Sequence, residues 1–255
     1  MGEINFLDVG CGDTSIIKTN GNVYLVDCYD IENHSYLLPS NKIIKALFVT
    51  HQHYDHFLGM KYLMENDYKI NYLIYSPYDR RRGDNSVQYE EWKDFTSYAK
   101  CFEYNGTKLY KPYRQGNFNT PWWSIDELKF YMLGPVNSIA DRDTRELHDA
   151  SLVFLVKANN RNCLFTGDAS DISLEWISNN TENYCNDILH ASHHGSINGA
   201  NLSFIKNANI KDTIISTKSG VHSNVPHSTA ISRYKSFTKN TVYRTDTNGN
   251  FKIYF

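Results

Sequence analysis

Long hydrophobic runs are missing from this sequence of 255 residues. No apolar stretch approaches the roughly 20 residues that a membrane-spanning helix needs. Residues 1–6 also lack the basic region and the apolar region of a secretory signal. These two absences predict a protein that does not engage a membrane and that stays in the cytoplasm.

An excess of charge of either sign is absent as well. The chain has 26 Lys and Arg against 28 Asp and Glu, for a formal net charge of -2. A protein without a global basic field does not attract nucleic acid over its whole surface, so any site for a polyanion must be local.

Paired cysteines are the third absence. The chain has five cysteines, an odd number, and no Cys-x-x-Cys spacing. Several of them lie in apolar, strand-like runs. The pattern predicts buried free thiols in a reducing compartment rather than a disulfide framework. The five are Cys11, Cys28, Cys101, Cys163 and Cys185.

What the sequence does have is a segment rich in histidine at residues 50–56, which reads Thr-His-Gln-His-Tyr-Asp-His. It follows a short apolar run at 46–49 that is typical of a buried strand, and it precedes a helix-like run at 57–65. Side chains at the end of a strand can converge above a rigid sheet. Imidazole and carboxylate groups are ligands that suit zinc and related metals.

The spacing inside this segment indicates two metals rather than one. His51 and His53 alternate in an extended stretch, so both rings point the same way. Asp55 and His56 begin the next turn and point elsewhere. A single histidine in this position would be read as a solvated or hydrogen-bonded side chain, but the whole His-x-His-x-Asp-His pattern predicts a metal site.

The order of strand-like and helix-like runs along the rest of the sequence predicts a mixed α/β chain. Residues 1–255 are expected to form a single domain. A β-meander opens the chain, polar residues follow several later strands, and residues 105–120 are expected to form a surface excursion or lid. Asp168 follows Gly167 at one strand end, where a helix cap is an equally good interpretation. A turn at 247–249 predicts a closing hairpin. The expected strands are 3–9, 15–17, 23–27, 46–49, 72–75, 128–133, 151–156, 163–166, 188–189, 213–216, 241–244 and 251–255, and the expected helices are 57–65 and 86–102.

Several motifs together resemble a known family. They are Leu-Asp-Val-Gly-x-Gly-Asp at 7–13, Leu-Val-Asp at 25–27, the histidine-rich segment at 50–56, Ser-Leu-Val at 151–153, Leu-Phe-Thr-Gly-Asp at 164–168, His-His-Gly-Ser at 193–196 and Arg-Thr-Asp-x-x-Gly at 244–249. In this order they resemble the metallo-β-lactamase superfamily, specifically the branch similar to the C-terminal hydrolase domain of ComEC/Rec2 competence proteins. The resemblance implies an αββα sandwich of two mixed β-sheets flanked by helices, with a dinuclear metal site at one edge.

The resemblance also implies roles for individual residues. His51 and His53 would bind the first metal with His148, a position where ComEC-like sequences often have Asn. The second metal would be bound by Asp55 and His56, and Asp168 would bridge the two metals. The last ligand of the second metal comes from the His193–His194 pair; His193 is favoured and His194 is the alternative. The metal is expected to be Zn²⁺, with Mn²⁺ as the alternative.

Such a ligand set predicts hydrolysis. Two divalent ions about 3.5–4 Å apart can hold a water and lower its pKa to around 7, which provides a metal-bridging hydroxide as nucleophile. Asp55 could orient the nucleophile as well as bind metal. His194 or His227 could protonate the leaving oxygen if it lies outside the ligand set.

The substrate predicted from the branch resemblance is a phosphodiester of DNA or RNA, cleaved by a nuclease that serves together with partner proteins in a larger system. Arg80, Arg81 and Arg82 could clamp phosphates, although a solvated basic loop is the alternative, and Ser196 is a further candidate substrate contact. A second hypothesis is a hydrolase of a small phosphodiester, such as a cyclic nucleotide or a phosphocholine-type ester. A third is a metal-stabilised binding module without catalysis, which the number of ligand-type residues disfavours.

Overall fold

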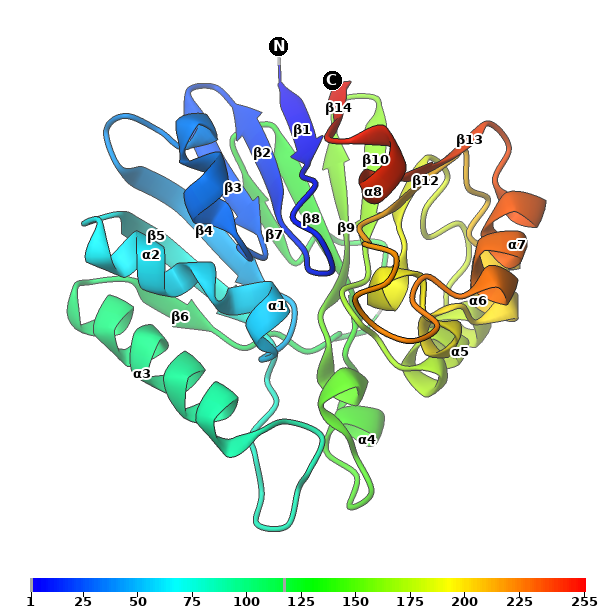
Figure 1. Ribbon diagram of the computed structural model, residues 1–255, viewed down its shortest axis with the longest axis horizontal. Coiled ribbons are helices and arrows are strands. Elements are labelled where there is room, and N and C mark those ends of the chain that lie inside the picture. Colours follow the sequence, from blue (N-terminus) through cyan, green and yellow to red (C-terminus); the bar gives the residue numbers. More distant parts are fainter. Residues whose placement is uncertain (1, 117) are drawn as a thin grey trace.

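The computed structural model describes residues 2–116 and 118–255. Two seven-stranded β-sheets pack face to face, and helices cover their outer faces (Figure 1). The first sheet has the order β14-β1-β2-β3-β4-β5-β6. Its strands are β1 (Glu3–Phe6), β2 (Ser15–Thr19), β3 (Asn22–Val26), β4 (Ile43–Val49), β5 (Lys69–Tyr75), β6 (Lys108–Tyr110) and β14 (Phe251–Tyr254).

The second sheet has the order β13-β12-β11-β10-β9-β8-β7. Both sheets are mixed, since β3, β4, β5 and β6 run parallel in the first and β10 to β13 run parallel in the second. The strands of the second sheet are β7 (Trp123–Ile125), β8 (Leu128–Gly134), β9 (Val153–Ala158), β10 (Arg161–Phe165), β11 (Ile188–His190), β12 (Asp212–Ile215) and β13 (Thr241–Arg244).

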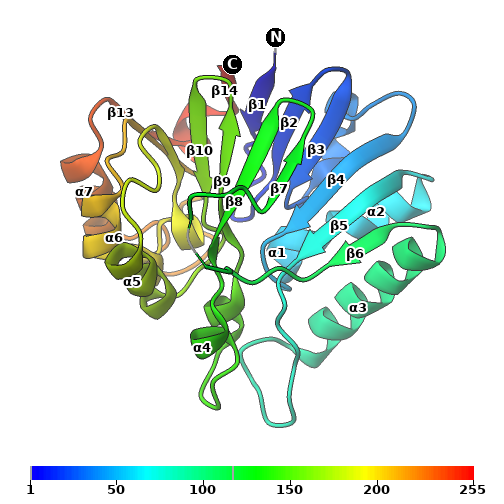
Figure 2. The ribbon, with the colours of Figure 1, turned by 180° about the vertical axis from the view of Figure 1, so that it is seen from behind.

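The helices lie in two outer layers. Seen from behind, α2 and α3 cover the first sheet and α5, α6 and α7 cover the second (Figure 2). The α-helices are α1 (Tyr54–Phe57), α2 (Gly59–Glu65), α3 (Tyr89–Tyr104), α4 (Asn137–Ala140), α5 (Asp171–Asn180), α6 (Leu202–Asn207), α7 (Ser228–Phe237) and α8 (Thr245–Asn248). Short 3-10 helices are η1 (Ile31–Leu37), η2 (Leu147–Ala150), η3 (Ser192–Gly195) and η4 (Ile197–Gly199).

Aromatic rings form the core between the sheets. Phe48 of the first sheet stacks on Phe130 and Phe154 of the second, with ring centroids 4.9 and 4.8 Å apart. Phe154 in turn stacks on Phe165, and Phe165 stacks on Phe6. Rings of this size bury large apolar areas, so this stack fixes how the two sheets face each other.

Strand β4 shows why the sheets are covered on both sides. Ala46 and Phe48 belong to the core between the sheets, whereas Leu47 and Val49 pack beneath the outer helices. Successive side chains in a strand point to opposite faces, so a strand buried on both faces reads as a continuous apolar run. The apolar run before the histidine-rich segment is therefore a central strand, and it holds that segment rigidly.

The expected αββα fold class is confirmed, and so are several of its parts. The opening meander is present, since β1, β2 and β3 pair antiparallel in sequence order. Strands β9 and β10 pair around the turn at 159–160, as expected.

The expected closing hairpin is wrong. Strand β13 pairs with β12 in the second sheet, whereas β14 pairs with β1 in the first sheet. Residues 245–248 form the short helix α8 between them. The chain therefore crosses from one sheet to the other at this point, and pairing β14 with β1 completes the first sheet.

Part of the stretch 105–120 differs from the expected surface excursion. Residues 108–110 form β6, which pairs parallel with β5 at the edge of the first sheet. Asn117, within the same stretch, lies outside the described residues. Within residues 2–116 and 118–255, no helix has both the length and the apolar character needed to cross a bilayer.

Candidate metal centre

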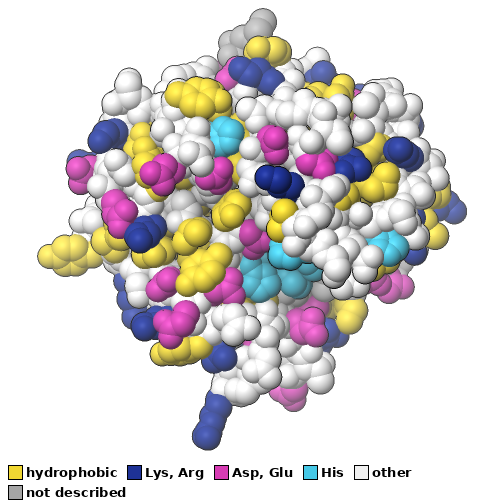
Figure 3. Space-filling view, in the orientation of Figure 1, with side chains coloured by type: hydrophobic (Ala, Val, Ile, Leu, Met, Phe, Trp, Pro, Cys, Tyr) yellow, Lys and Arg dark blue, Asp and Glu magenta, His cyan; other side chains and the backbone are white. Residues whose placement is uncertain are grey.

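The candidate site lies at one edge of the sandwich, where loops after strands of both sheets meet. Residues 50–56 follow β4, Asp168 follows β10, and the loop of His193 and His194 follows β11. His148 lies in η2, just before β9. Histidine side chains gather in a hollow on this face of the molecule (Figure 3). Segments far apart in the sequence thus deliver their polar side chains to one place.

The first group of candidate ligands consists of His51, His53 and His148. Nε2 of His51 lies 3.2 Å from Nδ1 of His53, and Nε2 of His148 lies 3.3 Å from the same atom. Ligand nitrogens around a tetrahedral zinc ion are about 3.3 Å apart, because each Zn–N bond is about 2.0–2.1 Å long. The nitrogens of His51 and His148 therefore lie at a distance from that of His53 that suits a shared tetrahedral zinc ion, and all three lie within 4.8 Å of one another.

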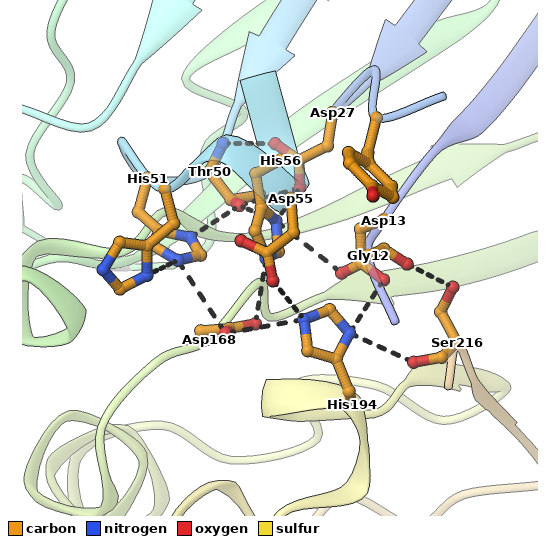
Figure 4. Close-up of polar contacts among 12 residues, drawn as sticks. Gly12, Asp13, Asp27, Thr50, His51, Asp55, His56, Asp168, His194 and Ser216 are labelled. Atoms are coloured by element: carbon orange, nitrogen blue, oxygen red, sulfur yellow. Dashed lines mark hydrogen bonds and ion pairs between the residues drawn. The ribbon is translucent and has the colours of Figure 1, made fainter. Parts of the chain in front are cut away.

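The second group consists of Asp55, His56 and His194. Nε2 of His194 lies 3.3 Å from Oδ2 of Asp55 (Figure 4). Asp168 lies beside both groups: its Oδ1 is 3.3 Å from Nε2 of His56, and its Oδ2 is 3.8 Å from Nε2 of His51. Its position between the groups is that of a carboxylate able to serve both.

The two adjacent histidines after β11 divide between the groups. His194 joins Asp55 and His56. The geometry therefore favours His194, the alternative in the sequence interpretation, over His193 as the last ligand of the second metal. His193 instead forms a candidate ligand group with His148 and Asp168: its ring centroid lies 4.7 Å from that of His148, and its Nε2 is 3.7 Å from Oδ2 of Asp168. The His193 side chain is 25% exposed, whereas that of His194 is 4% exposed.

Each of three candidate ligand histidines has one ring nitrogen hydrogen-bonded to the protein and the other turned toward its group. His56 donates from Nδ1 to Oδ2 of Asp27 at 2.9 Å, and His194 donates from Nδ1 to the Ser216 carbonyl at 3.1 Å. His53 donates from Nε2 to the carbonyl of Ser86 at 3.0 Å. Such partners fix the ring orientation and the tautomer, which leaves the second nitrogen able to bind a cation.

Several buried polar atoms of the cluster have no hydrogen-bond partner. Nε2 of His56, Nε2 of His194 and Oδ1 of Asp168 are buried and form no hydrogen bond. Unpaired buried polar atoms are costly, so a cluster of them that converges on one point needs an explanation. Divalent cations would satisfy all of these atoms at once, and imidazole with carboxylate is a donor set that suits zinc and related metals. The residues therefore fit a metal centre.

The pKa values in the cluster agree with this interpretation. Burial lowers the pKa of His51 well below its usual value and lowers that of His148 to about 3, so both rings are neutral. Burial also disfavours charge on His56 and His194, but carboxylates led by Asp168 outweigh it and raise their pKa well above the usual value. Without metal, protons on these two rings balance the buried carboxylates, and a bound cation would replace those protons.

The backbone at the two histidines is strained. His193 has φ 53° and ψ 48°, His194 has φ 51° and ψ 25°, and Gly195 follows with φ 77°. Left-handed conformations cost a residue with a Cβ roughly 1–2 kcal/mol. Two such residues in succession persist only where surrounding contacts hold them, as at functional sites. Here the amide of His193 donates to the carbonyl of Gly167, which ties this loop to the loop of Asp168.

The loop of Asp168 depends on the glycine before it. Gly167 has φ +46°, and a Cβ there would lie 2.5 Å from Cβ of Thr50. The loop can pack against the histidine-rich segment only because this side chain is absent. The alternative role of Asp168 as a helix cap is wrong, because Ser170 caps α5 by accepting a hydrogen bond from the amide of Ser173.

Two buried aspartates near the ligands had no role in the sequence interpretation. Asp27 accepts hydrogen bonds from the amide and the hydroxyl of Thr50, at 2.7 and 2.8 Å, and from His56. Burial raises the pKa of Asp27 to about 6. Asp13 lies 3.6 Å from Nδ1 of His194. Asp27 directly follows the apolar strand β3, and Asp13 ends the turn before β2. Their occurrence in the motifs at 7–13 and 25–27 was the available signal.

His227 and Ser196 have structural contacts at the edge of the site. The amide of His227 donates to the carbonyl of Gly195 at 2.9 Å, so His227 borders the loop of the paired histidines. Its Nδ1 accepts from the amide of Thr229 and caps α7. Ser196 is buried, and its hydroxyl accepts from the amide of Asn198 to cap η4. The local contacts of Ser196 thus involve the fold rather than an open surface.

A groove of about 700 Å³ opens beside His148. Arg81 and Arg82 line it together with Arg145. Arg80 does not: its Nε donates to the carbonyl of Val87 at 3.3 Å, and its guanidinium lies over the ring of Tyr89. The expected cluster of three arginines is therefore divided, with two of its members facing the groove. Acidic residues share the lining, namely Asp84, Asp143 and Glu146.

Known structures share this fold. The metallo-β-lactamase fold protein YhfI from Bacillus subtilis matches over 98% of this chain and 100% of its own, with 13% identity and a TM-score of 0.59. The short form of human tRNase Z matches over 99% and 98%, with 14% identity and a TM-score of 0.55.

CmlA, a diiron β-hydroxylase from Streptomyces venezuelae, matches over all of this chain with 12% identity and a TM-score of 0.61. The matched region is 54% of the hydroxylase, so this chain spans about half of that protein. Likenesses at such low identity show the fold alone. None of the curated proteins compared with the chain matches it in sequence.

The sequence of this chain also matches the model of a protein family. The model of the metallo-beta-lactamase superfamily matches residues 8–219, which includes all the candidate ligands described above. The fold and this match agree: the chain belongs to the metallo-β-lactamase superfamily.

Proposed function

We propose that this metal-dependent hydrolase of the metallo-β-lactamase superfamily is a phosphodiesterase that cleaves DNA or RNA with two bound divalent cations. The observation that carries the proposal is the groove beside His148, which presents Arg81 and Arg82 next to the candidate ligands. Guanidinium groups bind phosphate oxygens with two parallel hydrogen bonds, so such a groove suits a phosphodiester better than a neutral amide.

We propose that the candidate ligands form one set for each cation. His51, His53 and His148 would hold one cation, and Asp55, His56 and His194 would hold the other. Asp168 would contact both. Bound cations would supply a water acidified to near-neutral pKa and would offset the charge that develops on the phosphoryl oxygens. We propose Zn²⁺ as the native metal, with Mn²⁺ as the alternative.

Proton transfer to the leaving oxygen falls to a histidine that neither of these two proposed ligand sets uses. His193 suits this role because its ring is partly exposed beside His148 and faces the same centre as Asp168. His227 is the second candidate, since it borders the same loop and its Nε2 is not used in capping α7. A positioned acid of this kind contributes about 10²–10⁴-fold to the rate.

The proposal extends to the branch of the superfamily, the partner proteins and the cellular compartment of the enzyme. The His-His-Gly-Ser sequence at 193–196 and the Thr-Gly-Asp sequence at 166–168 support a ComEC/Rec2-like branch, acting together with partner proteins in a larger system. The five cysteines are all free thiols, which supports a reducing, cytoplasmic location.

Hydrolysis assays test the proposal. Purified protein is incubated with Zn²⁺ or Mn²⁺ and with labelled single-stranded DNA, double-stranded DNA, RNA or bis-p-nitrophenyl phosphate. We expect cleavage of at least one polynucleotide, and we expect His53→Ala and Asp168→Ala to abolish it while the fold survives. Hydrolysis of the small ester without any polynucleotide would favour the alternative, a hydrolase of small phosphodiesters. One tightly held ion and no hydrolysis of any substrate would instead favour a metal-stabilised binding module.

The arginines provide a matched pair of variants. Arg82→Ala removes a groove residue, whereas Arg80→Ala removes a neighbouring arginine that does not line the groove. We expect Arg82→Ala to raise KM for a polynucleotide with little change for bis-p-nitrophenyl phosphate, and Arg80→Ala to change neither. Equal effects of the two variants would contradict a phosphate-binding role for the groove.

A further inference from the structure

A second cleft lies on the other side of the histidine-rich segment. It is bounded by α3 and by the ends of β5 and β6, and its volume is about 530 Å³. Figure 2 shows α3 running alongside β6. We call it the α3 cleft; its aromatic walls are Tyr75, Tyr78, Trp92 and Phe95. The size and the aromatic lining are those of a site for a small molecule with a flat apolar surface.

An unpartnered hydrogen-bond acceptor lies in the lining of the α3 cleft. Gln52 stands between His51 and His53, and alternation along the segment turns it away from the candidate metals. Its side chain is 1% exposed, and its Nε2 donates to the carbonyl of Ser76 at 3.0 Å. Its Oε1 is buried and has no partner. A buried amide oxygen normally has a donor, so a donor from a bound ligand would complete this site.

The outer part of the cleft is charged. Lys100 and Lys111 line it, and Nζ of Lys111 lies 5.4 Å from the centroid of the Tyr75 ring. Asp79 and Glu103 also line it. The lining therefore offers aromatic faces and an acceptor inside, with cations and anions at the mouth. A flat ligand that carries N–H donors matches the inner part, and a phosphate attached to such a ligand would meet the two lysines.

We propose that the α3 cleft binds a nucleobase. The base would stack on the aromatic walls, and an N–H donor such as an exocyclic amine would bond to Oε1 of Gln52. Bases stack well on aromatic side chains because every base has a π-face. The base belongs either to a free nucleotide or to the nucleic-acid strand, and the two sources share this chemistry.

The cleft shares a wall with the groove at the candidate metal centre. The ring of Tyr78 lines the α3 cleft, whereas its hydroxyl donates to Asp84, which lines the groove beside His148. Asp84 in turn accepts from the amide of Ser86 at 3.0 Å, and the carbonyl of Ser86 accepts from His53. A base in the cleft would therefore contact Tyr78, which is connected through these hydrogen bonds to the candidate ligand His53.

The test compares two helix variants that add the same side chain. Thr96 lines the cleft and Ser97 does not, and both hydroxyls donate to the carbonyl four residues earlier in α3. Binding of adenosine to the metal-loaded, full-length protein is measured by calorimetry. Thr96→Phe fills the cleft and should weaken binding at least about tenfold, which corresponds to about 1.4 kcal/mol. Ser97→Phe should leave the affinity unchanged.

Purine riboside, which lacks the exocyclic amine, tests the contact with Gln52. Wild-type protein should bind adenosine more tightly than purine riboside, and Gln52→Met should remove this difference. In NMR titrations of the wild type, the indole N–H signal of Trp92 should shift while that of Trp176 stays in place; Trp92→Phe assigns the signal. This titration keeps the test valid if a variant fails to fold.

Three results would overturn the proposal: no saturable binding of adenosine at millimolar concentrations, equal binding by Thr96→Phe and Ser97→Phe, or indole binding as tightly as adenosine. Nucleosides contain no phosphodiester bond, so these outcomes are independent of whether the protein hydrolyses one. If Thr96→Phe raises KM for an oligonucleotide, the base comes from the substrate strand, and an unchanged KM assigns the cleft to a free nucleotide.

Discussion

At the scale of single residues, the site depends on groups that hold the ligands as much as on the ligands. Asp27 is the clearest example, because it accepts hydrogen bonds from Thr50 and from His56 at once. It thereby fixes the start of the histidine-rich segment and the tautomer of a ligand. Carboxylates behind a ligand imidazole orient it and raise its basicity.

Asp27→Asn tests this role. The amide cannot accept as strongly from Nδ1 of His56, so we expect metal affinity to fall about 10–100-fold, the usual effect of losing such a partner. Competition with a chromophoric chelator measures the affinity. Asp67→Asn makes the same change in an exposed turn and should leave the affinity as it is. Equal affinities for all three proteins would show that Asp27 does not act on the ligand.

The protonated imidazoles give a pH dependence. Burial disfavours the charged form of His56 and His194, yet neighbouring carboxylates raise the pKa of both rings well above the usual value. Metal binding must displace these protons, so the affinity should rise with pH through and above neutrality. Calorimetry in buffers of different ionisation enthalpy should show proton release on binding. A pH-independent affinity without proton release would contradict the assignment of these two ligands.

At the scale of elements, the loops that carry the ligands are held against each other by close backbone contacts. Gly167 lets the loop of Asp168 approach Thr50, and the amide of His193 bonds to the carbonyl of Gly167. Three ligand-bearing segments therefore meet around one glycine. A side chain at this position would displace all of them together.

Gly167→Ala should destabilise the protein more than its backbone conformation alone requires. An alanine at positive φ costs about 1 kcal/mol, and the contact of 2.5 Å with Thr50 adds to it, so we expect a total loss of about 1–3 kcal/mol. Gly106→Ala is the matched control: its φ is +94°, but no atom lies within 4 Å of the added Cβ. Urea unfolding measures both. Similar losses for the two variants would show that the loop contact is unimportant.

Elements with strong local signals could be predicted from the sequence, and those that depend on distant partners could not. The apolar run at 46–49 specifies a buried strand locally, and the pattern after it places several candidate metal ligands close together. The hairpin expected at 241–255 is wrong because the partner of β14 is β1, at the other end of the chain. Edge strand β6 was missed because only its pairing with β5 marks it as a strand.

The same distinction holds within the candidate site. Alternation along the segment was enough to separate His51 and His53 from Asp55 and His56. It could not decide between His193 and His194, because the direction of each ring depends on a left-handed backbone that two neighbouring loops impose. The resemblance pointed to the pair, and the tertiary structure places its two members in different candidate ligand groups.

At the scale of the whole molecule, the candidate centre joins the two sheets. Its candidate ligands come from loops of both, and the buried Asp168 lies among histidines of these loops. A cation that binds the native state alone stabilises it by about 2.7 kcal/mol at a free concentration 100 times Kd.

Removal of metal should therefore lower Tm. We expect the Tm of the dialysed protein to fall after treatment with EDTA and to recover when Zn²⁺ is restored. Mg²⁺ should not restore it, because that ion prefers oxygen ligands to imidazole. A Tm that does not respond to EDTA would argue against a bound cation in the native protein. Circular dichroism at low temperature serves as the control that the fold survives chelation.

We propose that segments distant in the sequence hold two cations on either side of Asp168. Anomalous diffraction at the zinc edge, from crystals grown with Zn²⁺, tests it most directly. We predict two peaks, one among His51, His53 and His148 and the other among Asp55, His56 and His194. A map with no peak at these residues, or with a single peak remote from Asp168, would contradict the claim.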